Sequence, residues 1–164
     1  MSETSSWVGP LRQKLREEVE KQERMEKHLR AFVSGYTELV DQIGKALEGT
    51  PASVSLSTTT INFPGLSGET KSQVFPYLNV RFRTRAFSLN PSVSFEGDQA
   101  TCVVNFSAHK PLPGLPNNMI HFVQKGDDFG WVVKSHSPGP AIKVGPMPWS
   151  PAKLGELLET ALLS

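Results

Sequence analysis

The chain has 164 residues, of which 38% are apolar, enough for one domain with a hydrophobic core and too few for two ordinary domains. Its 17 Lys and Arg residues nearly balance its 16 Asp and Glu residues, leaving a net charge of +1. This balance excludes a strong overall field that would attract nucleic acid or an anionic membrane. We therefore expect neither nucleic acid nor a membrane as a partner.

Residues 1–10 lack the basic and apolar regions of a secretory signal, and no run of 18 apolar residues occurs anywhere in the chain. We predict a disordered segment over residues 1–10 in a soluble, cytoplasmic protein whose single domain covers residues 11–164. Cys102 is the only cysteine, which excludes an internal disulfide and a thiolate metal cluster. Its apolar surroundings predict a buried, unreactive thiol, because no activating base can be placed beside it.

A long amphipathic helix is predicted over residues 11–48. Pro10 suits its first turn, and two seams follow with seven-residue spacing over five repeats. The seam positions are Leu11, Leu15, Glu18, Gln22, Met25, Leu29, Phe32, Tyr36, Leu39, Ile43 and Ala46. Polar residues interrupt the first half of the seams, whereas the second half is almost entirely apolar. We expect the second half to pack on the domain.

Such a helix would be roughly 55 Å long, about twice the diameter of a small domain. Its first half should therefore project, bend back or meet another chain. Gly35 and Gly44 indicate either a break or a close packing contact. Gly49 followed by Pro51 ends the helix.

From Ala52 onward, alternating β-branched and aromatic residues predict strands in an antiparallel meander over residues 53–136. We place about five strands, near residues 53–62, 77–89, 91–96 with 99–108, 118–125, and 129–136. Asn90-Pro91 is among the expected turns, and Pro76 is expected at the start of a strand. Residues 138–151 hold five prolines and predict an extended connector. Ser150-Pro151 then begins a short helix over residues 151–163.

Three arginines, Arg81, Arg83 and Arg85, alternate along the strand predicted over residues 77–89. Strand geometry would place their guanidinium groups on one face, where they could bind phosphate or a carboxylate-rich partner. The competing interpretation is an ordinary solvated face of the sheet.

His109, His121 and His136 lie on or near predicted strands. A metal site would need a third ligand and a defined register, so we predict none; a single histidine lining a pocket as a proton carrier is the alternative. The five acids between residues 49 and 150 fall in predicted turns, and motifs for a phosphate loop, a nucleophile elbow or a zinc helix are absent. We expect no cofactor.

Two segments resemble the nuclear-transport-factor-two-like superfamily. Residues 93–106 are similar to its strand, glycine-aspartate turn and strand unit, and residues 121–137 are similar to its final hairpin. The resemblance covers about residues 86–137. It implies a cone formed by a curved sheet around helices, with a pocket at the wide end and frequent dimerisation. The aspartate and tyrosine of the isomerases in that superfamily have no match here.

The sequence thus predicts α+β architecture, with a long helix packed on a curved antiparallel sheet and a short C-terminal helix. The first functional hypothesis is a non-catalytic binding or assembly module that forms a homo-oligomer through its N-terminal helix. The alternative, implied by the family resemblance, is a pocket for a small apolar ligand. That pocket could support lyase or isomerase chemistry, although we lean against an enzyme.

Overall fold

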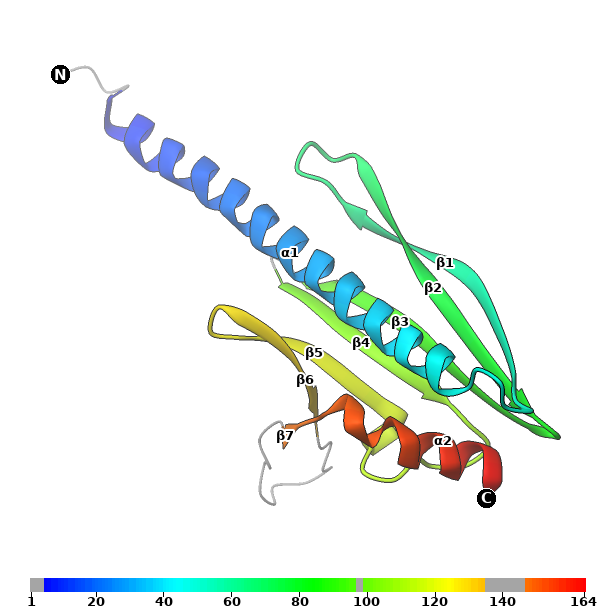
Figure 1. Cartoon of the computed structure of the whole chain (residues 1–164). Helices are drawn as coiled ribbons and strands as arrows, with labels where there is room; N and C mark the ends of the chain where they lie inside the picture. Colours follow the sequence, from blue (N-terminus) through cyan, green and yellow to red (C-terminus); the bar gives the residue numbers. More distant parts are fainter. Residues whose placement is uncertain (1–4, 97–98, 135–146) are drawn as a thin grey trace.

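The computed structural model of the protein describes residues 5–96, 99–134 and 147–164. Its architecture is α+β: a long helix α1 (Ser5–Ala46), an antiparallel sheet of seven strands in sequential order, and a short helix α2 (Leu154–Leu163) (Figure 1). The strands are β1 (Ser53–Pro64), β2 (Thr70–Phe82), β3 (Arg85–Glu96), β4 (Gln99–Ser107), β5 (Met119–Lys125), β6 (Asp128–Val133) and β7 (Met147–Pro148). The α+β class is as predicted, but the number of strands exceeds the expected five.

Helix α1 begins earlier than expected, so the prediction of disorder over residues 1–10 is wrong for Ser5 to Pro10; residues 1–4 lie outside the described part. The helix runs without a break through both glycines. It ends at Ala46, and Gly49 takes a φ of +74° in the turn that follows. Such a left-handed conformation favours glycine and explains why the helix stops here.

The predicted strand over residues 77–89 is wrong, because the chain reverses in its middle. Phe82 pairs with Arg85, which leaves Arg83 and Thr84 as a two-residue turn between β2 and β3. Such turns normally carry glycine or asparagine, since they need a positive φ. Here Arg83 adopts a φ of 55°, and its guanidinium lies 5.3 Å from the centroid of the Phe82 ring. The turn at Arg83 and Thr84 thus contains neither glycine nor asparagine, and composition could not predict it.

The two prolines lie inside strands, contrary to the predicted turn at Asn90-Pro91 and the predicted strand start at Pro76. Strands β2 and β3 pair only over Leu78–Phe82 and Arg85–Leu89. Two residues further along this register, Pro76 would lie opposite Pro91. Because neither proline has an N–H to donate, the ladder ends there. Beyond it the β1–β2 hairpin separates from β3 and β4 (Figure 1).

A second fork separates β5 from β4. Strand β4 pairs with β3 over its whole length from Gln99 to Ser107, but with β5 only over Cys102–Asn105. The β5–β6 hairpin therefore diverges from β4 as well, and the hairpins spread toward the end of the molecule where the N-terminus lies (Figure 1).

The core lies between the second half of α1 and the sheet. The helix contributes seven buried side chains: Met25, Leu29, Phe32, Tyr36, Leu39, Val40 and Ile43. Phe32 packs against Phe75, Phe122 and Trp131, with ring centroids 5.5, 5.8 and 6.1 Å away. Aromatic rings thus fill the space under the helix.

Gly35 permits a close approach between α1 and the sheet. A Cβ atom at this position would lie 3.0 Å from Cε1 of Phe122 and 3.4 Å from Cζ2 of Trp131, whereas one on Gly44 would meet nothing within 4 Å. Of the two alternatives left open by the sequence, Gly35 therefore serves close packing rather than a break. At the next residue, the Tyr36 hydroxyl donates a hydrogen bond to the carbonyl oxygen of Leu89 at 3.4 Å, and burial raises the pKa of this phenol.

The C-terminal part follows the predicted helix closely. Ser150 accepts a hydrogen bond from the Ala152 amide at 3.3 Å, and the one-turn 3-10 helix η2 (Pro151–Lys153) leads into α2. The apolar face of α2 is buried, as its spacing predicts. Of the predicted proline-rich connector, residues 138–146 lie outside the described residues, and Met147–Pro148 pair with β6 as β7.

Candidate functional site

The N-terminal turns of α1 project beyond the sheet (Figure 1). From Ser6 to Glu20 every side chain is exposed except the half-buried Val8, and Met25 is the first fully buried residue of the helix. We call residues Ser5–Glu17 the leading segment. The cavity between α1 and the β1–β2 turn starts at Glu18, which places the leading segment outside the fold.

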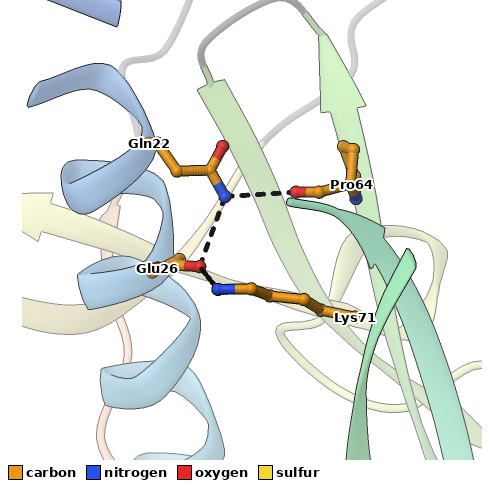
Figure 2. Close-up of polar contacts among 4 residues, drawn as sticks. All are labelled: Gln22, Glu26, Pro64 and Lys71. Atoms are coloured by element: carbon orange, nitrogen blue, oxygen red, sulfur yellow. Dashed lines mark hydrogen bonds and ion pairs between the residues drawn. The ribbon is translucent and has the colours of Figure 1, made fainter. Parts of the chain in front are cut away.

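Polar contacts fasten α1 to the β1–β2 hairpin just behind this segment (Figure 2). The Gln22 amide donates to the carbonyl of Pro64 at 3.1 Å and to Glu26 at 3.3 Å. The Lys71 ammonium donates to the Glu26 carboxylate at 2.6 Å. The Lys71 hydrogen bond lowers the pKa of Glu26 and, reciprocally, the pKa of Lys71 is raised. The helix is thus anchored to the β1–β2 hairpin at this point.

The leading segment carries apolar side chains at four-residue spacing that continue into the next turn. Trp7, Leu11, Leu15 and Val19 are 52%, 44%, 59% and 40% exposed. Residues four apart lie on the same side of a helix, so these four form one continuous surface, which we call the apolar stripe. A run of exposed large apolar side chains on one face is typical of an interaction surface.

A cavity of about 440 Å³ occupies the fork between β4 and β5. We call it the fork cavity. Its lining residues include Arg24, His28, Cys102, His121, Gln124 and Lys134, and no acidic residue is found among them in the described part of the chain. Neither Arg24 nor Lys134 forms an ion pair with another described residue. The cavity therefore presents positive charge and hydrogen-bond donors.

Two of the lining groups are held firmly. His28 Nε2 lies 2.9 Å from the carbonyl oxygen of Phe122, so this nitrogen carries a proton and donates, and the ring centroid is 5.1 Å from that of Phe129. Cys102 is 1% exposed, and burial raises the pKa of its thiol to about 12. At neutral pH this thiol stays protonated and is a poor nucleophile.

The three arginines do not form the predicted cluster. Arg81 lies on β2, Arg83 in the turn and Arg85 on β3, because the chain reverses between them. Arg85 is opposite Phe82 and shares its face of the sheet, whereas Arg81 is the residue before Phe82 and points to the other face. A single anion cannot be bound by all three side chains.

The predicted histidines are also separated. His121 is buried on β5, opposite Val103 of β4 and Val132 of β6, and contributes to the fork cavity. His109 is exposed beyond the other end of β4, and His136 lies outside the described residues. Sequence reasoning missed His28 and Arg24, which one turn of α1 brings to the cavity. Arg24 and His28 are four residues apart, so the sequence places them on one side of the helix. That this side faces a cavity follows only from the fork between β4 and β5.

No group of three or more potential metal ligands occurs among residues 5–96, 99–134 and 147–164. Within the same ranges, neither helix has the length and apolar character needed to cross a lipid bilayer.

No protein-family model matches the chain, and no characterised protein or solved structure is significantly similar to it.

Proposed function

We propose that this protein is a non-catalytic assembly module whose copies form a homo-oligomer through the leading segment of α1. The observation that carries the proposal is the apolar stripe, four large side chains that are each at least 40% exposed on a helix projecting from the fold. Fully burying a Leu side chain contributes about 1.5–3 kcal/mol. Burial of this surface against a protein partner is therefore more favourable than its exposure to water.

The contrast along α1 supports this proposal. A projecting helix of this length is marginal by itself in water, because short helices depend on packing for stability. The contacts of Gln22 and Glu26 with the β1–β2 hairpin hold the helix in line where it leaves the sheet. Because α1 is one continuous helix from Ser5 to Ala46, the leading segment does not fold back over its own domain, and its stripe is left for another chain.

The test is the molar mass of the full chain, measured by light scattering over a range of concentrations. Leu11→Gln/Leu15→Gln removes the centre of the stripe with little change in helix propensity. We expect wild-type protein to gain mass with concentration and the double variant to stay at the mass of one chain. Wild-type protein that stays monomeric at all concentrations would rule the proposal out.

A matched control lies on the same turns of the helix. Gln13 is two residues, or about 200° of helical rotation, from both Leu11 and Leu15, and Glu20 also lies on the far side. Gln13→Ala/Glu20→Ala should assemble like the wild-type protein. If this control also dissociates, the effect belongs to the helix as a whole rather than to its apolar stripe.

The fork cavity supports a second candidate, a site for a small anionic molecule. Rings fill the space under α1, which disfavours the enclosed apolar pocket implied by the family resemblance. The cationic lining instead suits a carboxylate or phosphate. His121 would be the proton carrier if the site had lyase or isomerase activity. A panel of small carboxylates and phosphates should raise the Tm of wild-type protein and of Arg30→Gln, an exposed position of α1 that does not line the cavity, but not that of Arg24→Gln. The absence of a shift with every compound would remove this candidate.

A further inference from the structure

A second apolar surface lies at the opposite end of the molecule from the apolar stripe. It is a groove of about 450 Å³ between the end of α1, the end of β2 and α2. We call it the terminal groove. Its apolar lining residues are Leu47, Ala52, Phe82, Leu158, Leu162 and Leu163. Leu163 is 69% exposed, so this surface also lacks cover.

The stripe cannot reach the terminal groove of its own chain. Helix α1 is continuous from Ser5 to Ala46, and Leu47 lines the groove directly behind its last turn. Leu15 and Leu47 are 32 residues apart, which corresponds to roughly 48 Å along a helix. A stripe that occupies the groove must therefore come from another copy.

Charge favours this contact. The stretch from Leu11 to Arg16 contains three bases, Arg12, Lys14 and Arg16, and no acid. Helix α2 contains two acids, Glu156 and Glu159, and no base, and Glu159 lines the groove. The next residues of the helix, Glu17 and Glu18, are acids, so the complementarity is confined to Leu11–Arg16. Leu11 and Leu15 placed in the groove would bring the three bases toward the acids of α2.

Charge also disfavours pairing between two stripes. In a parallel pair of α1 helices, Glu18 on the seam would meet its own copy. In an antiparallel pair with Leu11 opposite Leu15, Arg12 would lie beside Arg12 of the other copy, and Lys14 beside its Lys14. The parallel arrangement brings like charges together at the end of the stripe, and the antiparallel arrangement does so at its centre.

Resting on the proposed function, we propose that the apolar stripe of one copy docks in the terminal groove of the next, so that the molecules associate head to tail. Each copy then offers one stripe and one groove. Such a contact uses two different surfaces, so it extends into a ring or an open chain rather than closing as a twofold dimer.

A groove variant can be made without disturbing the core. Gly155 lines the groove, and a Cβ atom on it would meet nothing within 4 Å. Gly155→Gln should therefore fill the groove with a side chain while α2 keeps its packing. Gly44→Gln is the matched control, because Gly44 has the same free space but does not line the groove.

Molar mass by sedimentation is measured for Gly155→Gln, for Leu11→Gln/Leu15→Gln and for their equimolar mixture. Each variant alone should bind its own copies at least about tenfold more weakly than wild-type protein does, since either change removes one side of every contact. The mixture should form a discrete complex of two chains, joined by the intact stripe of one variant and the intact groove of the other. Gly44→Gln should assemble normally. Formation of the mixed complex also shows that both variants are folded.

The failures are distinguishable. If Gly155→Gln assembles like wild-type protein and only Leu11→Gln/Leu15→Gln dissociates, the head-to-tail contact is overturned, while assembly through the helix stands. If both variants dissociate and the mixture also stays at the mass of one chain, the head-to-tail contact is likewise overturned. If wild-type protein itself is a monomer, both the contact and the proposed function fail.

Discussion

The two halves of α1 are built from the same helical repeat but have different environments. From Met25 to Ile43 the seam residues are buried against the sheet, with Phe32, Tyr36 and Ile43 at most 1% exposed. In the leading segment the apolar residues face water. The difference comes from the sheet, since the turn of the β1–β2 hairpin reaches the helix only as far as Glu18. The spacing of apolar residues therefore specifies which face of the helix is suited to burial. The length of the sheet determines how much of that face the same chain can bury.

The largest expected effect is the difference in unfolding free energy between two truncations on these halves. Phe32→Ala removes a ring that contacts four other rings, so it should cost about 3–5 kcal/mol. Leu15→Ala removes an exposed side chain and should cost less than about 0.5 kcal/mol. Urea unfolding of monomeric protein at low concentration measures both, and equal losses would contradict the distinction between the halves.

Thiol reactivity gives the next contrast. Because burial raises the pKa of Cys102 to about 12, the thiolate fraction at pH 8 should be roughly three orders of magnitude below that of an exposed cysteine. Native wild-type protein should react with a thiol reagent only slowly. Gln13→Cys in a Cys102→Ala background, with its thiol on the leading segment, should react at the rate of a free thiol. Similar rates at the two positions would argue against the tight packing of β4 under α1.

The two glycines of the buried half offer a smaller and more local comparison. Gly44→Ala should stabilise the protein by about 0.5–1 kcal/mol, because alanine favours the helix and the site has free space. Gly35→Ala should lose that gain, since its Cβ would lie 3.0 Å from Cε1 of Phe122. Thermal unfolding of the two variants ranks them directly. If Gly35→Ala is as stable as Gly44→Ala, α1 and β5 are not in close contact.

The smallest effect concerns the ion pair at the boundary between the halves. Because Lys71 lowers the pKa of Glu26 in the folded protein, the pair should stabilise the fold above the usual carboxyl pKa. This contribution should be lost as the pH falls through the pKa of folded Glu26. The stability difference between wild-type protein and Glu26→Gln should therefore shrink from pH 7 to pH 3. Glu38→Gln, at an exposed position of α1, should show no such change.

Much of the fold follows from local sequence signals. Heptad spacing predicted α1, Ser150-Pro151 predicted the start of the closing helix, and alternation predicted most of the sheet. The errors arose where the backbone adopts a conformation that the local residue types do not predict. Arg83 forms a hairpin turn without a turn residue, and Pro76 and Pro91 end one ladder inside longer strands.

The candidate sites were less predictable, because they depend on contacts between distant segments. The exposed first half of α1 was anticipated from its length and its polar seam positions. The terminal groove joins residues near Leu47, Phe82 and Leu158, and the fork cavity joins α1 to β4 and β5. Neither could be derived without the register of the sheet. Kinship with the nuclear-transport-factor-two-like superfamily stays a prediction.

Amide hydrogen exchange at several protein concentrations tests the central claim most directly. In a monomer, the leading segment has no packing partner, and its amides should exchange rapidly while those from Met25 to Ile43 stay protected. We predict that protection of residues 5–19 rises with concentration and that protection of the second half does not. Exchange in the leading segment that is the same at every concentration would contradict assembly through this helix.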